Sequence, residues 1–305
     1  MEETVKLVSP QGGSSLIGHS FVSTYQKCPR RWFLRYVLFI KERYIGKALS
    51  FGKAWHTAIE HYYRGEGEEA ALRCGLEDLA SSEPFYEYAD DYTADLERFS
   101  RMFAEWLVSV GRPITTSYTI LAVEEDMDVE LPGGLRYTGR LDDILQHNES
   151  GAIFVGEHKS TSFSLEVMER TVAQSDQVTG YVAMWREKHP EDADRMLGGL
   201  LDVCYQKGSV TRARTSSLRF SHDDIARFWL NTQGLLSEMS QKVAAYESGV
   251  SDALLFPRNG HACSQFKCPY EAICRSYVNA DTLLPDSLQR DPECHRYSPE
   301  ERYGA

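Results

Sequence analysis

The sequence lacks the features of an exported or membrane-spanning protein. Its first residues, MEETVKLVSPQGG, begin with two glutamates and contain no basic segment followed by an apolar run, which a secretory signal requires. No window approaches the roughly 18 consecutive apolar residues that cross a bilayer, and the apolar runs at 36–40 and 197–203 are short. We therefore expect a soluble, cytoplasmic protein that does not contact membranes.

Positive charge is also scarce. The 305 residues include 33 Lys and Arg against 45 Asp and Glu, which gives a formal net charge of −12 and argues against a uniformly basic coat for nucleic acid. The seven cysteines are an odd number in a long chain without an export signal, which fits a reducing compartment better than a disulfide framework. No internal repeat or low-complexity segment is present, and 42% hydrophobic residues indicate an ordinary globular protein.

The few positive charges are gathered in two stretches. Residues 20–53 contain eight Lys and Arg against one acid, Glu42, and residues 207–219 contain four basic residues and no acid. Aromatic residues interleave the first stretch, namely Tyr25, Trp32, Phe33, Tyr36 and Tyr44. Proteins that bind single strands use this mixture for phosphates and stacked bases. The alternative is that both stretches are ordinary solvated faces.

Hydrophobic periodicity predicts a helical N-terminal third followed by a mixed region. Helices are expected near 20–37, 51–64, 68–80, 92–110, 165–188 and 222–247, and strands at 118–131, 135–146, 152–159, 199–206 and 215–220. The first three strands follow one another and are expected to be antiparallel neighbours, and Gly208 suggests a hairpin before the last strand. After Pro257 the chain turns to short irregular pieces.

A carboxylate and an amine are expected at the end of the strand at 152–159. Residues two apart on a strand share a face, so Glu157 and Lys159 project together. If the preceding strand pairs across the turn at 148–151, Asp142 comes close enough to Glu157 for both to hold one hard cation such as Mg²⁺. Lys159 would then orient water or stabilise charge on a phosphate, which outlines phosphodiester hydrolysis. The alternative is a surface Glu–Lys pair beside an edge-strand aspartate.

Two further strings place polar side chains on helices. In the helix expected at 165–188, Gln177 and Tyr181 lie four apart on one face, and Gln174 lies on the same stripe. In the string GKAWH, His56 lies on the flank of an otherwise apolar stripe. A lone histidine at such a position is most often structural.

The strings GKAWH, GRLDD, EHK and QVTGY occur in the order in which one family carries them. Over residues 20–275 the chain resembles the RecB-like nucleases of the PD-(D/E)XK superfamily. The resemblance implies an α/β restriction-endonuclease-like core, a mixed sheet flanked by helices. The expected organisation is a tail at 1–19, a helical region at 20–112, the nuclease core at 113–256, a Cys-rich metal-cluster segment at 257–280 and a polar tail at 281–305.

The same resemblance implies roles for individual residues. Lys159 would be the catalytic lysine, and Gln177 and Tyr181 would support the active site and contact DNA. The metal ligands would be His56, Asp142, Glu157 and the backbone carbonyl of His158. The residues alone leave two points open, because Asp143 could replace Asp142, and Glu124 or Glu125 could join the site.

Three cysteines fall within twelve residues near the C-terminal end, at Cys263, Cys268 and Cys274. Core packing does not require this, and it is typical of a metal-ligand cluster. The candidates for a fourth ligand are Cys28, Cys74, Cys204 and Cys294. Resemblance to the iron–sulfur members of the family, the AddB type and the CRISPR-associated exonucleases, implies Cys28 and a structural 4Fe-4S cluster. Zinc with Cys294 among its ligands, or free thiols, are the alternatives, and Cys74 and Cys204 are expected to be buried small hydrophobes.

We therefore expect a DNA exonuclease dependent on Mg²⁺ or Mn²⁺, acting on single strands or duplex ends in recombination and repair, phage DNA processing or CRISPR adaptation. An alternative is an assembly subunit that binds DNA and hands ends to a helicase, recombinase or CRISPR integrase without cutting. Another is a nuclease of RNA. The intact Asp142, Glu157 and Lys159 favour an enzyme. Because the sequence has no P-loop string, an unwinding motor would be a separate protein.

An acidic protein that binds DNA needs its positive charge to converge on the active site. We therefore predict DNA contacts from Arg30 and Arg31 in the first basic stretch and from Arg212 and Arg214 in the second. The alternatives are that these arginines are surface or packing residues, or that Arg30 and Arg31 support the cysteine site.

Overall fold

The computed structural model of the protein describes residues 17–43, 46–81, 89–265, 268–276, 278 and 282–290, without the side chains of 89–91 and 265. Most of the two predicted tails, together with Tyr44 and Cys294, lies outside these residues. The chain forms two compact units. Unit 1 comprises residues 1–44, 128–139 and 229–305, and unit 2 comprises residues 45–127 and 140–228. In the described ranges, no helix combines the length and the apolar character that crossing a bilayer requires.

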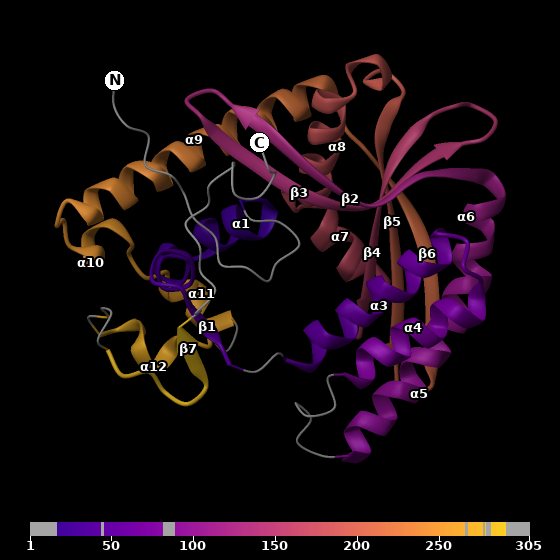
Figure 1. Ribbon diagram of the computed structural model, residues 1–305, viewed down its shortest axis with the longest axis horizontal. Coiled ribbons are helices and arrows are strands. Elements are labelled where there is room, and N and C mark those ends of the chain that lie inside the picture. The colour runs from indigo at the N-terminus through magenta and orange to yellow at the C-terminus, as the bar shows by residue number, and fades with distance from the viewer. Residues whose placement is uncertain are drawn as a thin grey trace. The chain divides into compact units, whose positions relative to one another are not determined.

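A five-stranded mixed sheet is the centre of unit 2 (Figure 1), with strands in the order β2-β3-β4-β5-β6. The end of β2, the start of β3 and the turn between them, residues 128–139, belong to unit 1. The strands are β2 (Tyr118–Leu131), β3 (Leu135–His147), β4 (Ile153–Thr161), β5 (Met196–Lys207) and β6 (Val210–Arg219). β4 is antiparallel to β3 and parallel to β5, and β5 forms the predicted hairpin with β6 around Gly208. A parallel pair needs a crossover connection, and the helices between β4 and β5 supply it.

Helices cover both faces of this sheet. Unit 2 contains α3 (Lys47–Tyr63), α4 (Glu68–Ala80), α5 (Ala89–Trp106), the π-helical turn η3 (Leu107–Gly111), α6 (Arg112–Ser117), α7 (Leu165–Ala173), α8 (Asp176–Lys188) and the 3-10 turn η4 (Pro190–Asp192). On one face, Trp55 of α3 and Phe103 of α5 pack against Phe154 of β4. On the other, Leu165 of α7 and Val178 of α8 pack against Leu201 of β5. The predicted mixed sheet flanked by helices is confirmed.

Two predicted helices are divided in the structure. The helix expected near 20–37 is interrupted at Cys28, whose backbone is extended. The single helix expected at 165–188 is two helices, because α7 ends at Ala173 and α8 begins at Asp176. The hydroxyl of Ser175 accepts a hydrogen bond from the backbone N–H of Gln177 and so caps α8. Gln174 therefore belongs to the end of α7 and is not on the stripe of Gln177 and Tyr181.

Unit 1 gathers segments from both ends of the sequence. It contains α1 (His19–Lys27), α2 (Pro29–Trp32), the π-helical turn η1 (Phe33–Val37), β1 (Ile40–Glu42), α10 (Asp252–Leu255), α11 (Gly260–Gln265), α12 (Glu271–Cys274) and β7 (Leu288–Arg290). β1 and β7 form an antiparallel two-stranded sheet. The long helix α9 (His222–Glu247) begins in unit 2 and continues in unit 1.

The aromatic residues of the first basic stretch form the core of unit 1. Tyr25, Trp32, Phe33 and Tyr36 are buried. Phe33 stacks on Phe256 with ring centroids 4.7 Å apart, and Trp32 meets Tyr25 edge to face at 5.3 Å. Their interpretation as a surface for stacked bases is therefore wrong, because their rings are used in packing.

Candidate metal and catalytic site

Three side chains of unit 2 converge from three elements, His56 from α3, Glu124 from β2 and Asp142 from β3. Each offers one ligand atom, and these atoms lie within 4.8 Å of one another. Nδ1 of His56 is 3.3 Å from Oδ2 of Asp142. Among the described residues, this is the one set of three His, Cys, Asp or Glu side chains with that spacing. Two carboxylates and an imidazole are suitable ligands for a divalent cation.

Glu124 joins the set at an irregular point of β2. Its backbone φ of 52° lies in the left-handed region, which non-glycine residues rarely adopt. Residues 118–121 alternate between half-buried and exposed, but 122–125 are all half-buried. The strand period therefore could not decide between Glu124 and Glu125, and the structure brings Glu124 to Asp142.

The carboxyl group of Glu124 is electrostatically unusual. Burial raises its pKa to about 7, and the negative charge of Asp142 adds to this shift while His56 opposes it. Two carboxylates held together away from water repel each other, and a bound cation would relieve this repulsion. Such perturbed groups are typical of functional sites. The donor set and its charge therefore fit a divalent metal.

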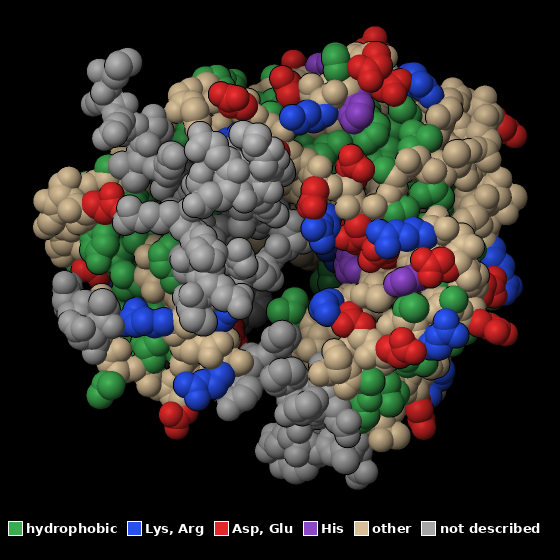
Figure 2. All heavy atoms as spheres, viewed as in Figure 1, with side chains coloured by type: hydrophobic (Ala, Val, Ile, Leu, Met, Phe, Trp, Pro, Cys, Tyr) green, Lys and Arg blue, Asp and Glu red, His purple; other side chains and the backbone are tan. Residues whose placement is uncertain are grey.

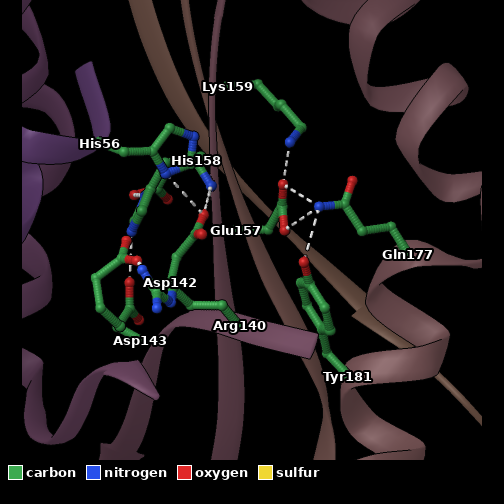
Figure 3. Close-up of polar contacts among 11 residues, drawn as sticks. His56, Arg140, Asp142, Asp143, Glu157, His158, Lys159, Gln177 and Tyr181 are labelled. Atoms are coloured by element: carbon green, nitrogen blue, oxygen red, sulfur yellow. Dashed lines mark hydrogen bonds and ion pairs between the residues drawn. The ribbon is translucent and has the colours of Figure 1, made fainter. Parts of the chain in front are cut away.

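Glu157 lies beside this set and is fully buried. Both of its carboxylate oxygens lie 3.0 Å from Nε2 of Gln177, which is also 3.2 Å from the hydroxyl of Tyr181. The ammonium group of Lys159 donates to the same carboxylate. Figure 3 shows these three side chains pointing toward Glu157. One turn of α8 thus presents Gln177 and Tyr181 together, as their spacing predicts.

The candidate metal ligands and the Glu157–Lys159 pair influence one another's charges. Burial opposes ionisation of Asp142, but the charge and hydrogen bond of His56 outweigh it and lower the pKa of Asp142. Burial likewise opposes the charged form of Lys159, but the carboxylates of Glu157 and Asp142 outweigh it and raise the pKa of the lysine. The constellation of His56, Asp142, Glu157 and Lys159 is therefore one electrostatic neighbourhood.

The two adjacent aspartates of β3 face opposite ways. Asp142 accepts a hydrogen bond from the backbone N–H of His158, 3.1 Å away, and lies beside His56. Asp143 is fully buried and contacts the ring of His158 instead. Of the two alternatives that the sequence left open, the structure therefore brings Asp142 to the candidate metal ligands. The backbone carbonyl of His158 as a further ligand stays a prediction.

The four predicted cluster cysteines lie near one another in unit 1. Cys28, Cys263, Cys268 and Cys274 are not joined in disulfides. The pKa of Cys274 is raised, first by burial and then by the thiols of the other three. Within the described part of the chain, no three of these sulfur atoms have the 4.8 Å spacing of His56, Glu124 and Asp142. Four thiols are a donor set for zinc or for an iron–sulfur cluster.

The other two described cysteines have different surroundings. Cys204 on β5 is buried in the core of unit 2, and burial raises the pKa of its thiol. This confirms its prediction as a buried small hydrophobe. Cys74 on α4 is half-buried.

Arg30 connects the segment of Cys28 to the segment of Cys274. It is buried and pairs with Asp252. Its guanidinium also donates to the backbone carbonyls of Cys274 at 3.3 Å and Ser276 at 2.8 Å. These contacts favour the alternative that Arg30 supports the cysteine site.

The second pair of predicted DNA-binding arginines lies on β6. The guanidinium of Arg214 makes two hydrogen bonds with the carboxylate of Glu169 on α7. Arg212 is exposed, and no carboxylate of the described residues lies within ion-pair distance of it. Of this pair, Arg212 is the one with a guanidinium available for a phosphate.

The fold and the site define a class of protein, an α/β core with carboxylates, a histidine and a lysine gathered at neighbouring strands. A sequence profile of the PD-(D/E)XK nuclease superfamily matches residues 17–275, and the chain belongs to this superfamily. Its members are generally metal-dependent nucleases. A solved structure described as "Crystal structure of SSO0001" is similar at 14% identity over 60% of this chain and 74% of that chain, with a TM-score of 0.28. Comparison with curated proteins finds no match.

Proposed function

We propose that the protein is a RecB-like, metal-dependent DNA exonuclease that acts on single strands or duplex ends and carries a structural 4Fe-4S cluster. The observation that carries this proposal is the convergence of His56, Glu124 and Asp142 beside the buried Glu157–Lys159 pair. Membership of a nuclease superfamily supports the reaction class. DNA as the substrate and exonuclease action come from the resemblance in motifs.

His56, Glu124 and Asp142 would hold the divalent metal, with Glu157 and the carbonyl of His158 as further ligands by resemblance. When bound, Mg²⁺ or Mn²⁺ polarises a phosphoryl oxygen and makes water more acidic. The protein side chains do the positioning. Lys159 is held against Glu157 and supplies a positive charge for the phosphate, while Gln177 and Tyr181 fix the orientation of the Glu157 carboxylate.

The cysteine site would have a structural role in this proposal. Cys28, Cys263, Cys268 and Cys274 would ligate the cluster, and Arg30 and Asn259 already hold their segments together. The side-chain amide of Asn259 donates to the carbonyl of Lys27 at 2.8 Å, and its backbone N–H lies 3.5 Å from Sγ of Cys28. A cluster there would cross-link segments from both ends of the sequence.

Binding of DNA by this protein would depend on local charge, since the net charge is −12. On the face drawn in Figure 2, the described Lys and Arg side chains are interspersed with Asp and Glu and do not form one continuous basic area. A single strand has a lower charge density than a duplex, so an acidic protein repels it less. This favours single strands or frayed ends.

The test uses purified protein with single- and double-stranded DNA labelled at either end, in Mg²⁺, Mn²⁺ or EDTA. We expect stepwise shortening from an end with either metal and none with EDTA. Lys159→Ala should slow cutting about 100-fold or more, because a preorganised positive charge is lost. Lys188→Ala is the matched control, since Lys188 is an exposed lysine at the end of α8.

Two results would contradict the proposal. Cutting by Lys159→Ala at the wild-type rate would mean that the site is assigned to the wrong residues. Wild-type protein that binds DNA but cuts it with neither metal would favour the assembly subunit instead.

A further inference from the structure

A chain of buried polar side chains crosses the sheet on the face of β4 opposite to Glu157 and Lys159. The ring of His158 on β4 lies between two carboxylates, Asp143 on β3 and Asp202 on β5. Nδ1 of His158 is 3.1 Å from Oδ2 of Asp202, and the hydroxyl of Thr215 on β6 donates to the other oxygen of Asp202 at 2.8 Å. Four neighbouring strands are joined in this way.

These groups are withdrawn from water. Asp143, His158 and Asp202 are 0%, 1% and 3% exposed. Both ring nitrogens of His158 face carboxylate oxygens, and a protonated ring can donate to both at once. Ionic groups at such depth destabilise a protein unless each finds its partner. Hydrophobic side chains of the same size would fill this part of the core without buried charges. The presence of these buried polar side chains therefore needs a further explanation.

Gly156 makes room for the chain. It lies opposite Asp143 in the pairing of β3 with β4. A Cβ atom at this position would lie 2.0 Å from Oδ1 of Asp143. The segment Gly156–Lys159 therefore serves two faces in alternation. Gly156 and His158 serve the buried polar chain, and Glu157 and Lys159 serve the candidate catalytic site.

The polar chain connects to the candidate metal site through the backbone. The residue whose ring is fixed by Asp143 and Asp202 is also the residue whose backbone N–H donates to Asp142, 3.1 Å away. A shift of His158 would therefore move this donor away from Oδ2 of Asp142, the same oxygen that lies 3.3 Å from His56.

We infer that His158 is a positioning residue, whose side chain, held by Asp143 and Asp202, fixes the backbone that orients Asp142 for the metal. This inference rests on the proposed function, since it needs Asp142 to be a metal ligand. Groups that orient metal ligands commonly change metal affinity or activity about 10- to 100-fold when they are removed. In this arrangement the ring nitrogens of His158 face Asp143 and Asp202, while its backbone N–H donates to the candidate metal ligand Asp142.

The test measures the affinity for Mn²⁺ alone, from the electron paramagnetic resonance signal of the free ion, and the Mn²⁺ concentration that half-saturates cutting. His158→Phe keeps a ring but removes the contacts with Asp143 and Asp202. We expect the affinity for Mn²⁺ to fall, and the half-saturating Mn²⁺ concentration to rise, about 10-fold or more. The KM for DNA at saturating Mn²⁺ should stay unchanged, because the ring does not meet DNA.

His158→Phe removes the histidine partner of two buried carboxylates, Asp143 and Asp202, and leaves Asp202 with Thr215. Because this variant can fail to fold, two milder variants extend the series. Asp202→Asn keeps the shape of the side chain but removes its charge, and Thr215→Val removes only the outermost hydrogen bond. Both should weaken Mn²⁺ binding in the same direction, Thr215→Val less than Asp202→Asn. A purely structural role would lower the melting temperature without this order in metal affinity.

Met102→Ala is the matched control, because Met102 is fully buried in the core of unit 2 on α5 and its side chain has no polar group. It should lower the melting temperature and leave Mn²⁺ affinity unchanged. Folded Asp202→Asn and Thr215→Val proteins with wild-type Mn²⁺ affinity would overturn the inference alone. Wild-type protein that neither binds Mn²⁺ nor cuts DNA would overturn the proposed function, and the inference with it.

Discussion

The carboxylate site of unit 2 and the cysteine site of unit 1 are held together by different means. The carboxylate site takes its residues from long elements, and strand pairing and helix periodicity bring them together. The cysteine site takes its residues from short helices and from segments more than 200 residues apart in sequence. There, a few buried polar contacts do what regular secondary structure does in unit 2. The first site is therefore expected to withstand small changes better than the second.

Removing a cysteine should have the largest effect, and it tests whether the cysteine site and the carboxylate site are independent. Protein purified without oxygen should be brown and contain about four iron and four sulfide per chain. Cys28→Ala should lose this iron and much of the stability, because the cluster would close a loop spanning most of the chain. Its affinity for Mn²⁺ should remain that of the wild type if the two sites are independent.

Cys74→Ala provides the matched control for this change, since Cys74 on α4 belongs to the other unit and should leave the iron content unchanged. Stoichiometric zinc without sulfide would reject the cluster. Full iron occupancy in Cys28→Ala would show that Cys28 is not the fourth ligand of the cluster.

A second change addresses the polar contacts of unit 1. Arg30→Met should lower the free energy of unfolding by about 3 kcal/mol, because it leaves Asp252 buried without its partner. The double variant Arg30→Met/Asp252→Leu should recover most of this loss. Urea unfolding measures both, and Arg112→Ala, which breaks the exposed pair with Glu68, should change it far less. Equal losses in the single and double variants would mean that Arg30 acts through its carbonyl contacts alone.

A third change addresses the strand packing of unit 2. Gly156→Ala should lower the free energy of unfolding by about 1–3 kcal/mol, because its Cβ would collide with the carboxylate of Asp143. The control is Gly234→Ala on α9, where no atom lies within 4 Å of the added carbon, so we expect a small gain in stability. A stable Gly156→Ala protein would show that Asp143 moves aside without cost.

The smallest expected effect concerns the surface of β6. Arg212→Ala should lower the slope of log affinity for single-stranded DNA against log salt by about 0.7, the loss of one phosphate contact. Arg214→Ala should change this slope less, since its guanidinium is occupied by Glu169. Titrations over a range of salt compare the two variants, and equal slopes in both would mean that DNA follows another path.

Much of the fold was accessible from sequence because its elements are long and periodic. The helix at Glu68–Ala80, the strand at Tyr118–Leu131 and the helix at His222–Glu247 have the predicted bounds. The prediction of one helix at 165–188 was wrong because the apolar period continues through residues 174 and 175, while the cap formed by Ser175 acts locally. Periodicity averages over a window and cannot detect a two-residue break.

The site was accessible where residues are fixed by strand or helix spacing. The spacing of Glu157 and Lys159 and that of Gln177 and Tyr181 matches the arrangement in the structure. The positive φ of Glu124 and the burial of Arg30 were not accessible, because both depend on contacts far apart in sequence. Asp202 was missed for the same reason, although an aspartate within the apolar run Leu200–Val203 is a signal that could have been noticed.

The aromatic core of unit 1 has a consequence for the synthesis of the chain. Phe33 leaves the ribosome about 220 residues before its stacking partner Phe256, which at about 5–20 residues per second is a delay of roughly 10–45 s. During this time Tyr25, Trp32, Phe33 and Tyr36 have no access to the C-terminal part of their core. The nascent chain should therefore expose an aggregation-prone aromatic segment while unit 2 is being synthesised. Molecular chaperones that bind such segments should associate with it until Phe256 emerges.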